Sequence, residues 1–143
     1  MILSKDEVDF YNEKGYLLVE DVITEDQHNE MLRLVKDFFE KSKNVKKNDN
    51  IFDLEDGHSS TNPRLKRVKQ PHQHSKFFWD IIKQSKIEGI LIDLLGKDIS
   101  LKTSKLNTKA PGGGAAVEWH QDWAFYPHTN DNVLAIGLML NDV

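Results

Sequence analysis

The chain has no cysteine, and this absence excludes several kinds of chemistry. Disulfide bonds, thiolate metal sites and cysteine nucleophiles all need a thiol that the chain does not have. A chain without disulfides is compatible with a reducing compartment, so we expect a cytoplasmic location.

Long apolar runs and a strong charge of one sign are absent as well. No apolar stretch approaches the roughly 20 residues that a helix needs to cross a bilayer. The N-terminus carries acidic residues close to its start and lacks the apolar segment that a signal peptide contains. Nineteen Lys and Arg residues against 23 Asp and Glu residues give a net charge of −4. We therefore expect no binding to nucleic acid and no binding to a membrane surface.

Local signals predict several helices within this chain of 143 residues, which is long enough for one domain. Ser4 to Glu7 and Thr24 to Gln27 are capping boxes, and Gly15 is expected to end the first helix. Further helices are predicted near residues 77–82 and over 87–95. The second helix carries apolar residues at helical spacing: Met31, Leu34, Val35, Phe38 and Phe39.

The remaining segments read as strands and loops. Alternating or β-rich stretches predict strands at 16–19, 64–70, 99–107 and 133–140, whereas 41–62 is polar and predicted as loop. Helices dominate the first part and strands the last, without regular alternation of the two. This order predicts an α+β fold with a mainly β core.

The triplet His120-Gln121-Asp122 is the most informative feature of the sequence. Side chains alternate along a strand, so His120 and Asp122 should point to the same side. Together they supply two of the three ligands of the two-His-one-carboxylate site of non-haem Fe(II) oxygenases. The alternative is a hydrogen-bonded surface pair, because short patterns arise often by chance. His128 is the only local candidate for a third ligand, and it would need a sharp reversal of the chain.

Aromatic residues surround the triplet, and a glycine-rich loop at 111–114 precedes it. These aromatic residues are Trp119, Trp123, Phe125 and Tyr126. A second pair with metal-ligand spacing, His72 and His74, has no carboxylate nearby, and we expect it to lie in a loop or at a helix start. The triplet is therefore the stronger candidate for a metal site.

The run from Lys105 to Gly112, followed by Trp119 to Asp122, is similar to the first metal-binding segment of a known enzyme family. Residues 3–19 are similar to the opening helix and strand of that family. Residues 94–99 are similar to the part of that family where a helix ends and a strand begins. Residues 134–142 are similar to the strand that follows its first metal-binding segment. The chain thus resembles the phytanoyl-CoA dioxygenase family of Fe(II)/2-oxoglutarate oxygenases over nearly its whole length.

The resemblance implies a double-stranded β-helix, the cupin-like jelly roll, with N-terminal helices that buttress one sheet. It implies a single domain over 1–143, with a helical and strand part over about 1–97 and the first jelly-roll strands over about 98–143. The family's distal His and its 2-oxoglutarate-binding Arg would lie downstream of Val143. We therefore expect a truncated roll that is part of a longer enzyme, or that self-associates through exposed strand edges.

The resemblance also implies an enzymatic activity and the residues that take part in it. It implies Fe(II) held by His120 and Asp122, with 2-oxoglutarate and O2 as co-substrates, and hydroxylation of a small organic molecule. Asn107 and Lys109 are the candidates for binding 2-oxoglutarate, although Lys109 could also be a solvated strand-end residue. Relatives that halogenate replace the carboxylate ligand by a small residue, so the presence of Asp122 favours hydroxylation.

Two residues are candidates for the substrate pocket, and other functions stay open. Gln70 and Trp123 could line the pocket, but a loop amide and a core or wall aromatic are the alternatives. A non-catalytic jelly-roll binding protein or truncated inactive homologue would keep the fold without turnover. A metal-dependent isomerase or hydrolase on the same roll is a further alternative.

Overall fold

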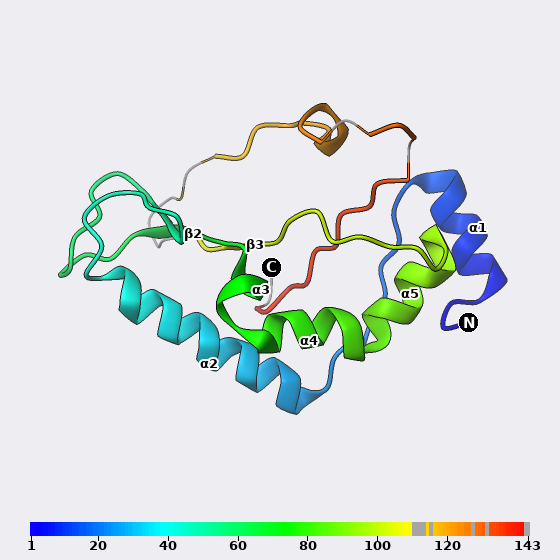
Figure 1. Cartoon of the computed structure of the whole chain (residues 1–143), viewed down its shortest axis with the longest axis horizontal. Coiled ribbons are helices and arrows are strands. Elements are labelled where there is room, and N and C mark those ends of the chain that lie inside the picture. The colour runs from blue at the N-terminus through cyan, green and yellow to red at the C-terminus, as the bar shows by residue number, and fades with distance from the viewer. Residues whose placement is uncertain (110–113, 115, 127, 131, 142–143) are drawn as a thin grey trace.

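Helices and a small antiparallel sheet form an α+β arrangement in the computed structural model, which describes residues 1–109, 114, 116–126, 128–130 and 132–141. Figure 1 shows α2 and α4 on one side of the strands and the segment that carries η1 on the other. The elements are α1 (Lys5–Lys14), α2 (Glu25–Ser42), β1 (Phe52–Leu54), β2 (Leu65–Lys69), α3 (Pro71–His74), α4 (Lys76–Gln84), α5 (Lys86–Leu95), β3 (Lys105–Asn107) and the 3-10 turn η1 (Asp122–Ala124).

Both predicted capping boxes are confirmed. The Ser4 hydroxyl accepts the Glu7 N–H and the Glu7 carboxylate accepts the Ser4 N–H, while Thr24 and Gln27 repeat the exchange at the start of α2. These bonds satisfy N–H groups that a helix start otherwise leaves without partners. Gly15 ends α1 at φ 77°, a left-handed conformation that glycine adopts without strain from a Cβ atom.

The sheet has the order β1-β2-β3, and both of its strand pairs are antiparallel. Val68 lies at its centre, opposite Phe52 on one side and Leu106 on the other. These three side chains are buried, so they point to one face of the sheet, toward the helices. Residues one position along each strand point to the opposite face, where polar side chains gather.

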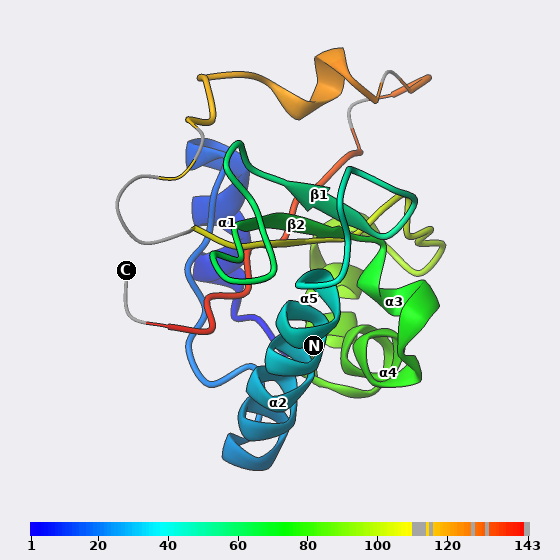
Figure 2. The same ribbon diagram turned by 90° about the vertical axis from the view of Figure 1, so that its left-hand side faces the viewer.

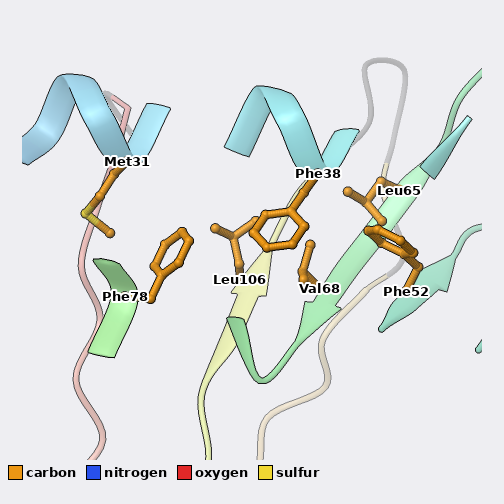
Figure 3. Close-up of a cluster of buried hydrophobic side chains, with 7 residues drawn as sticks. All are labelled: Met31, Phe38, Phe52, Leu65, Val68, Phe78 and Leu106. Atoms are coloured by element: carbon orange, nitrogen blue, oxygen red, sulfur yellow. The ribbon is translucent and has the colours of Figure 1, made fainter. Parts of the chain in front are cut away.

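The main core lies between this sheet face, α2 and α4 (Figure 3). Its central aromatic residue, Phe38, packs against Phe52 of β1 and Phe78 of α4, with ring centroids 6.3 and 6.2 Å away. A second cluster of Ile81, Ile87 and Leu91 joins α4 to α5. The buried residues of the main core are Met31, Phe38, Phe52, Leu65, Val68, Phe78 and Leu106.

The predictions for the strands are only partly correct. The strand predicted at 64–70 is confirmed as β2, but that predicted at 99–107 shrinks to Lys105–Asn107. No strand forms at 16–19 or 133–140, whereas β1 forms in the segment predicted as loop. A strand needs a neighbour to receive its hydrogen bonds, and among the described residues no strand lies along 133–140. There, Leu134, Leu138 and Leu140 pack against the helical clusters instead.

The α+β class is therefore confirmed, but the expectation of a mainly β core is wrong for the described residues. The helices α2 and α4 supply about as much of the main core as the three short strands. Within the same part of the chain, no helix is both long and apolar enough to cross a membrane.

The N-terminus is held against α5 by one carboxylate. Asp93 Oδ2 accepts the N–H of Leu3 at 2.9 Å and that of Ile2 at 2.5 Å. The hydrogen bond from Leu3, helped by that from Ile2 and by the N-terminal ammonium, holds the pKa of the Asp93 carboxyl below its usual value. The attachment should therefore be present above the ordinary Asp pKa of about 3.9 and be lost as the pH falls through the lowered value.

We expect the amide proton shift of Leu3 to titrate with an inflection below the usual Asp range when an NMR series is recorded from neutral to acidic pH. In Asp93→Asn the carboxylate is gone, and this inflection should disappear. An unchanged Leu3 titration in that variant would contradict the attachment.

Candidate metal centre

The His120-Gln121-Asp122 triplet lies on the side of the sheet opposite α2 and α4 (Figure 2). Gln121 is extended, with φ −109° and ψ 125°, and Asp122 then begins η1. Two residues that flank an extended residue point to the same side. Accordingly, His120 Nε2 and Asp122 Oδ1 lie 3.2 Å apart.

The strand on which the pairing of His120 with Asp122 was expected is not present. Instead, the Asp122 carbonyl accepts the N–H groups of Phe125 and Tyr126, at 2.9 and 3.1 Å. These bonds close a tight turn directly after the pair and hold the backbone of Asp122. The two side chains therefore meet because of one extended residue and a turn, without a sheet.

The hydrogen bonding of His120 determines which ring nitrogen can bind a metal. Nδ1 lies 2.7 Å from the Glu118 carbonyl, which can only accept, so Nδ1 carries the proton. In a ring with one proton, Nε2 then carries the lone pair that binds a metal, whereas a protonated Nε2 donates to Asp122. A metal-binding His commonly donates its other N–H to a carbonyl in this way.

The separation of the two ligand atoms fits one metal ion. Ligands at right angles, with bonds of about 2.1 Å to a first-row divalent ion, lie about 3 Å apart. The distance of 3.2 Å between His120 Nε2 and Asp122 Oδ1 is close to this value. Nitrogen and carboxylate oxygen are also a donor set that suits Fe(II).

A third protein ligand does not join the pair among the residues that the structure describes. His128, the local candidate, directs Nδ1 toward the Tyr126 carbonyl instead. The pair is also open, because the His120 and Asp122 side chains are 42% and 43% exposed.

The aromatic residues around the pair do not form a closed wall. Trp119, Trp123 and Phe125 are all exposed, Trp119 fully so. Phe125 nevertheless contacts His120 edge to face, with ring centroids 5.7 Å apart. Trp123, a candidate for the substrate pocket, directs its indole N–H toward the Asn130 carbonyl at 3.5 Å.

The two candidates for 2-oxoglutarate lie on or just after β3. Asn107 is exposed on the polar face of the sheet, opposite Arg67 of β2. Lys109 is exposed two residues further and lies against Gly114, where an added Cβ atom would be 2.7 Å from Lys109 Cδ. A side chain at position 114 would therefore require the flexible end of the Lys109 side chain to move. Residues 111–113 of the glycine-rich loop, and Ala110 before it, lie outside the described residues.

One contact links β3 to the segment that carries His120 and Asp122. Lys105 Nζ lies 5.6 Å from the ring centroid of Tyr126, four residues after Asp122. Lys105 and Asn107 share the polar face of β3, because Leu106 between them is buried on the other face. The face that carries Asn107 is therefore the face on which Tyr126 lies.

Gln70 lies before α3 in a left-handed conformation, with φ 46° and ψ 54°. Its backbone N–H donates to the Ser104 carbonyl at 3.0 Å, and its exposed side chain bonds to Gln73. Among the described contacts, none joins Gln70 to His120 or Asp122. The pair His72 and His74 falls in the short helix α3, where His72 Nδ1 meets the Ser104 hydroxyl and no metal cluster forms among the described residues.

Sequence reasoning missed Arg67, which lies beside Asn107, and Asp53, which lies on the other side of Arg67. Arg67 Nε donates to Asn107 Oδ1 at 3.0 Å, and Arg67 Nη1 lies 3.9 Å from Asp53 Oδ2. The alternation in 64–70 indicated that Arg67 would face away from the core. The sequence carried no signal for its partners, because these depend on which strands pair.

Two curated proteins that are similar to this chain are named as dioxygenases. A probable alpha-ketoglutarate-dependent hypophosphite dioxygenase of Stutzerimonas stutzeri is 36% identical over 132 residues, which cover 92% of this chain and 46% of that protein. An ectoine dioxygenase of Streptomyces avermitilis is 23% identical over 130 residues, covering 86% of this chain and 39% of that protein. The chain thus spans less than half the length of these curated relatives. Residues 11–143 match the family described as Phytanoyl-CoA dioxygenase (PhyH), and the chain belongs to this family.

Proposed function

We propose that the protein is an Fe(II)/2-oxoglutarate-dependent dioxygenase that hydroxylates a small molecule. The observation that carries this proposal is the distance of 3.2 Å between His120 Nε2 and Asp122 Oδ1, in a chain of this family. The two atoms belong to ligand types that suit Fe(II), and their separation is close to the value of about 3 Å for adjacent coordination positions.

Each candidate residue has a proposed task. His120 and Asp122 hold the iron, which when bound supplies open positions for 2-oxoglutarate and O2. The Glu118 carbonyl keeps the proton on His120 Nδ1, so that Nε2 stays directed at the metal position. Asn107 donates a hydrogen bond to 2-oxoglutarate, and Lys109 pairs with a carboxylate.

We propose a small polar substrate, with Gln70 and Trp123 as pocket residues. Two of the relatives are named for hypophosphite and for ectoine, and both compounds are small and polar. The hypophosphite relative supports a phosphorus oxyanion as the first compound to test, and ectoine represents the organic alternative.

We also propose a jelly-roll fold for the whole protein. In the whole protein, residues of about 98–143 would contribute the first strands of a jelly roll, and the helical part of about 1–97 would buttress it. Under this proposal the apolar segment 133–140 becomes a strand once neighbouring strands are present. A cytoplasmic location and self-association through strand edges stay predictions.

The test is succinate formation by the whole protein that contains this chain. We expect succinate only when Fe(II), 2-oxoglutarate, O2 and a substrate are all present, with hypophosphite and ectoine supplied in separate reactions. Succinate formed at the same rate without iron or without O2 would contradict the proposal. Conversion of a substrate without any succinate would favour a metal-dependent isomerase or hydrolase.

A further inference from the structure

A row of three side chains crosses the polar face of the sheet, one from each strand. Asp53 of β1, Arg67 of β2 and Asn107 of β3 are paired across the strands in register. Arg67 Nε donates to Asn107 Oδ1 at 3.0 Å, and Arg67 Nη1 lies 3.9 Å from Asp53 Oδ2. Arg67 and Asp53 are mostly covered, with 29% and 19% of their side chains exposed, so water screens this contact only partly.

This contact determines the orientation of the Asn107 amide. A guanidinium group has only donors, so the atom of Asn107 that faces Arg67 must be the carbonyl oxygen. The NH2 group of Asn107 then points away from Arg67. With the reverse orientation, two donors would face each other and one hydrogen bond would be lost.

The charge of this face favours an anion near the NH2 group. Arg67 and Lys105 supply positive charge, whereas the charge of Lys69 is offset by Asp53, whose Oδ1 lies 2.8 Å from Lys69 Nζ. Lys105 also contacts Tyr126, four residues after Asp122. An oxyanion held there would receive a hydrogen bond from a neutral amide amid a positive surrounding.

We infer that Arg67 is a positioning residue that fixes the Asn107 amide with its NH2 group directed at a bound oxyanion. The inference rests on the proposed function for the choice of ligands. The oxyanion is either a carboxylate of 2-oxoglutarate or an anionic substrate such as a phosphorus oxyanion. Arg67 itself need not touch the ligand, because it acts through the orientation of Asn107.

The experiment measures dissociation constants by calorimetry in the absence of O2, with the whole protein and Fe(II). The probes are 2-oxoglutarate in one series and hypophosphite in the other, so that the weakened series identifies the ligand. Arg67→Met should weaken binding of one probe about tenfold, the effect of losing one oriented hydrogen bond. Asn107→Asp should weaken the same probe at least as much. Its carboxylate still accepts from Arg67 but has no NH2 group to donate.

A matched control and a double variant separate positioning from charge and from folding. Lys69→Met removes a positive charge from the same face of the same strand, but Lys69 Nζ bonds to Asp53 at 2.8 Å and not to Asn107. We expect less than about a threefold change there. Combining Arg67→Met with Asn107→Ala should weaken binding no further than Asn107→Ala alone, because both changes remove one interaction. Arg67→Lys, which keeps one donor, should restore part of the affinity if Arg67→Met folds poorly.

Two outcomes would overturn the inference. One is unchanged affinity for both probes in a folded Arg67→Met protein; continued succinate formation in that protein would leave the proposed function standing. The other is equal weakening by Lys69→Met and Arg67→Met, which would indicate general attraction by charge. Oxyanion binding that depends on Arg67 and Asn107, in a protein that forms no succinate, would support the inference and remove the proposed function.

Discussion

His120→Ala is expected to reduce 2-oxoglutarate-dependent turnover of the whole protein by more than about a hundredfold, and Asp122→Ala by a similar factor. Changing a residue that only supports a metal ligand already costs about tenfold to a hundredfold in metal affinity or activity. Loss of a ligand itself should cost more, because one of the two atoms 3.2 Å apart is then missing. The measurement is the rate of succinate formation at saturating 2-oxoglutarate.

Gln121→Ala is the matched control for these two variants. Gln121 lies between the ligands, but an extended backbone at this position directs its side chain away from the pair. Its turnover should stay within about threefold of the unchanged protein. Full activity in His120→Ala or in Asp122→Ala would remove the proposed metal site.

Phe38→Ala is expected to lower the free energy of unfolding by about 3–5 kcal/mol, the range for truncation of a buried aromatic residue. Phe38 is only 6% exposed and packs between Phe52 and Phe78, so it joins α2 to both the sheet and α4. Removal of its ring leaves a cavity that these neighbours cannot fill. Urea unfolding followed by circular dichroism measures the change.

Leu18→Ala provides the comparison for Phe38→Ala. Leu18 is 81% exposed, and its truncation should change the unfolding free energy by less than about 0.5 kcal/mol. Equal losses in the two variants would contradict the core described for the sheet, α2 and α4.

Helices were the part of the fold that the sequence predicted best, because their signals are local. Ser4 and Glu7, or Thr24 and Gln27, lie three residues apart, and the bonds between them need no distant partner. Strands were predicted less well, because a strand forms only where another strand pairs with it. Residues 133–140 have the composition of a strand but no paired neighbour among the described residues, whereas Phe52–Leu54 pairs with β2 and forms one.

The residues of the candidate site also differ in how well the sequence predicted them. His120 and Asp122 were found from a spacing of two residues, and only the extended backbone of Gln121 is needed to bring them together. Arg67 and Asn107 lie 40 residues apart, and their hydrogen bond depends on the register of β2 against β3. No pattern within either segment indicates that register. Residues such as Arg67 therefore become candidates only when the paired strands are known.

We propose that His120 and Asp122 form an iron site that also takes 2-oxoglutarate. The most direct test is the visible absorbance of the whole protein under argon, with Fe(II) and 2-oxoglutarate added in turn. We predict a band that needs both additions and disappears in His120→Ala and in Asp122→Ala, but not in Gln121→Ala. Absence of the band from the folded, unchanged protein, or its persistence in both ligand variants, would contradict the account.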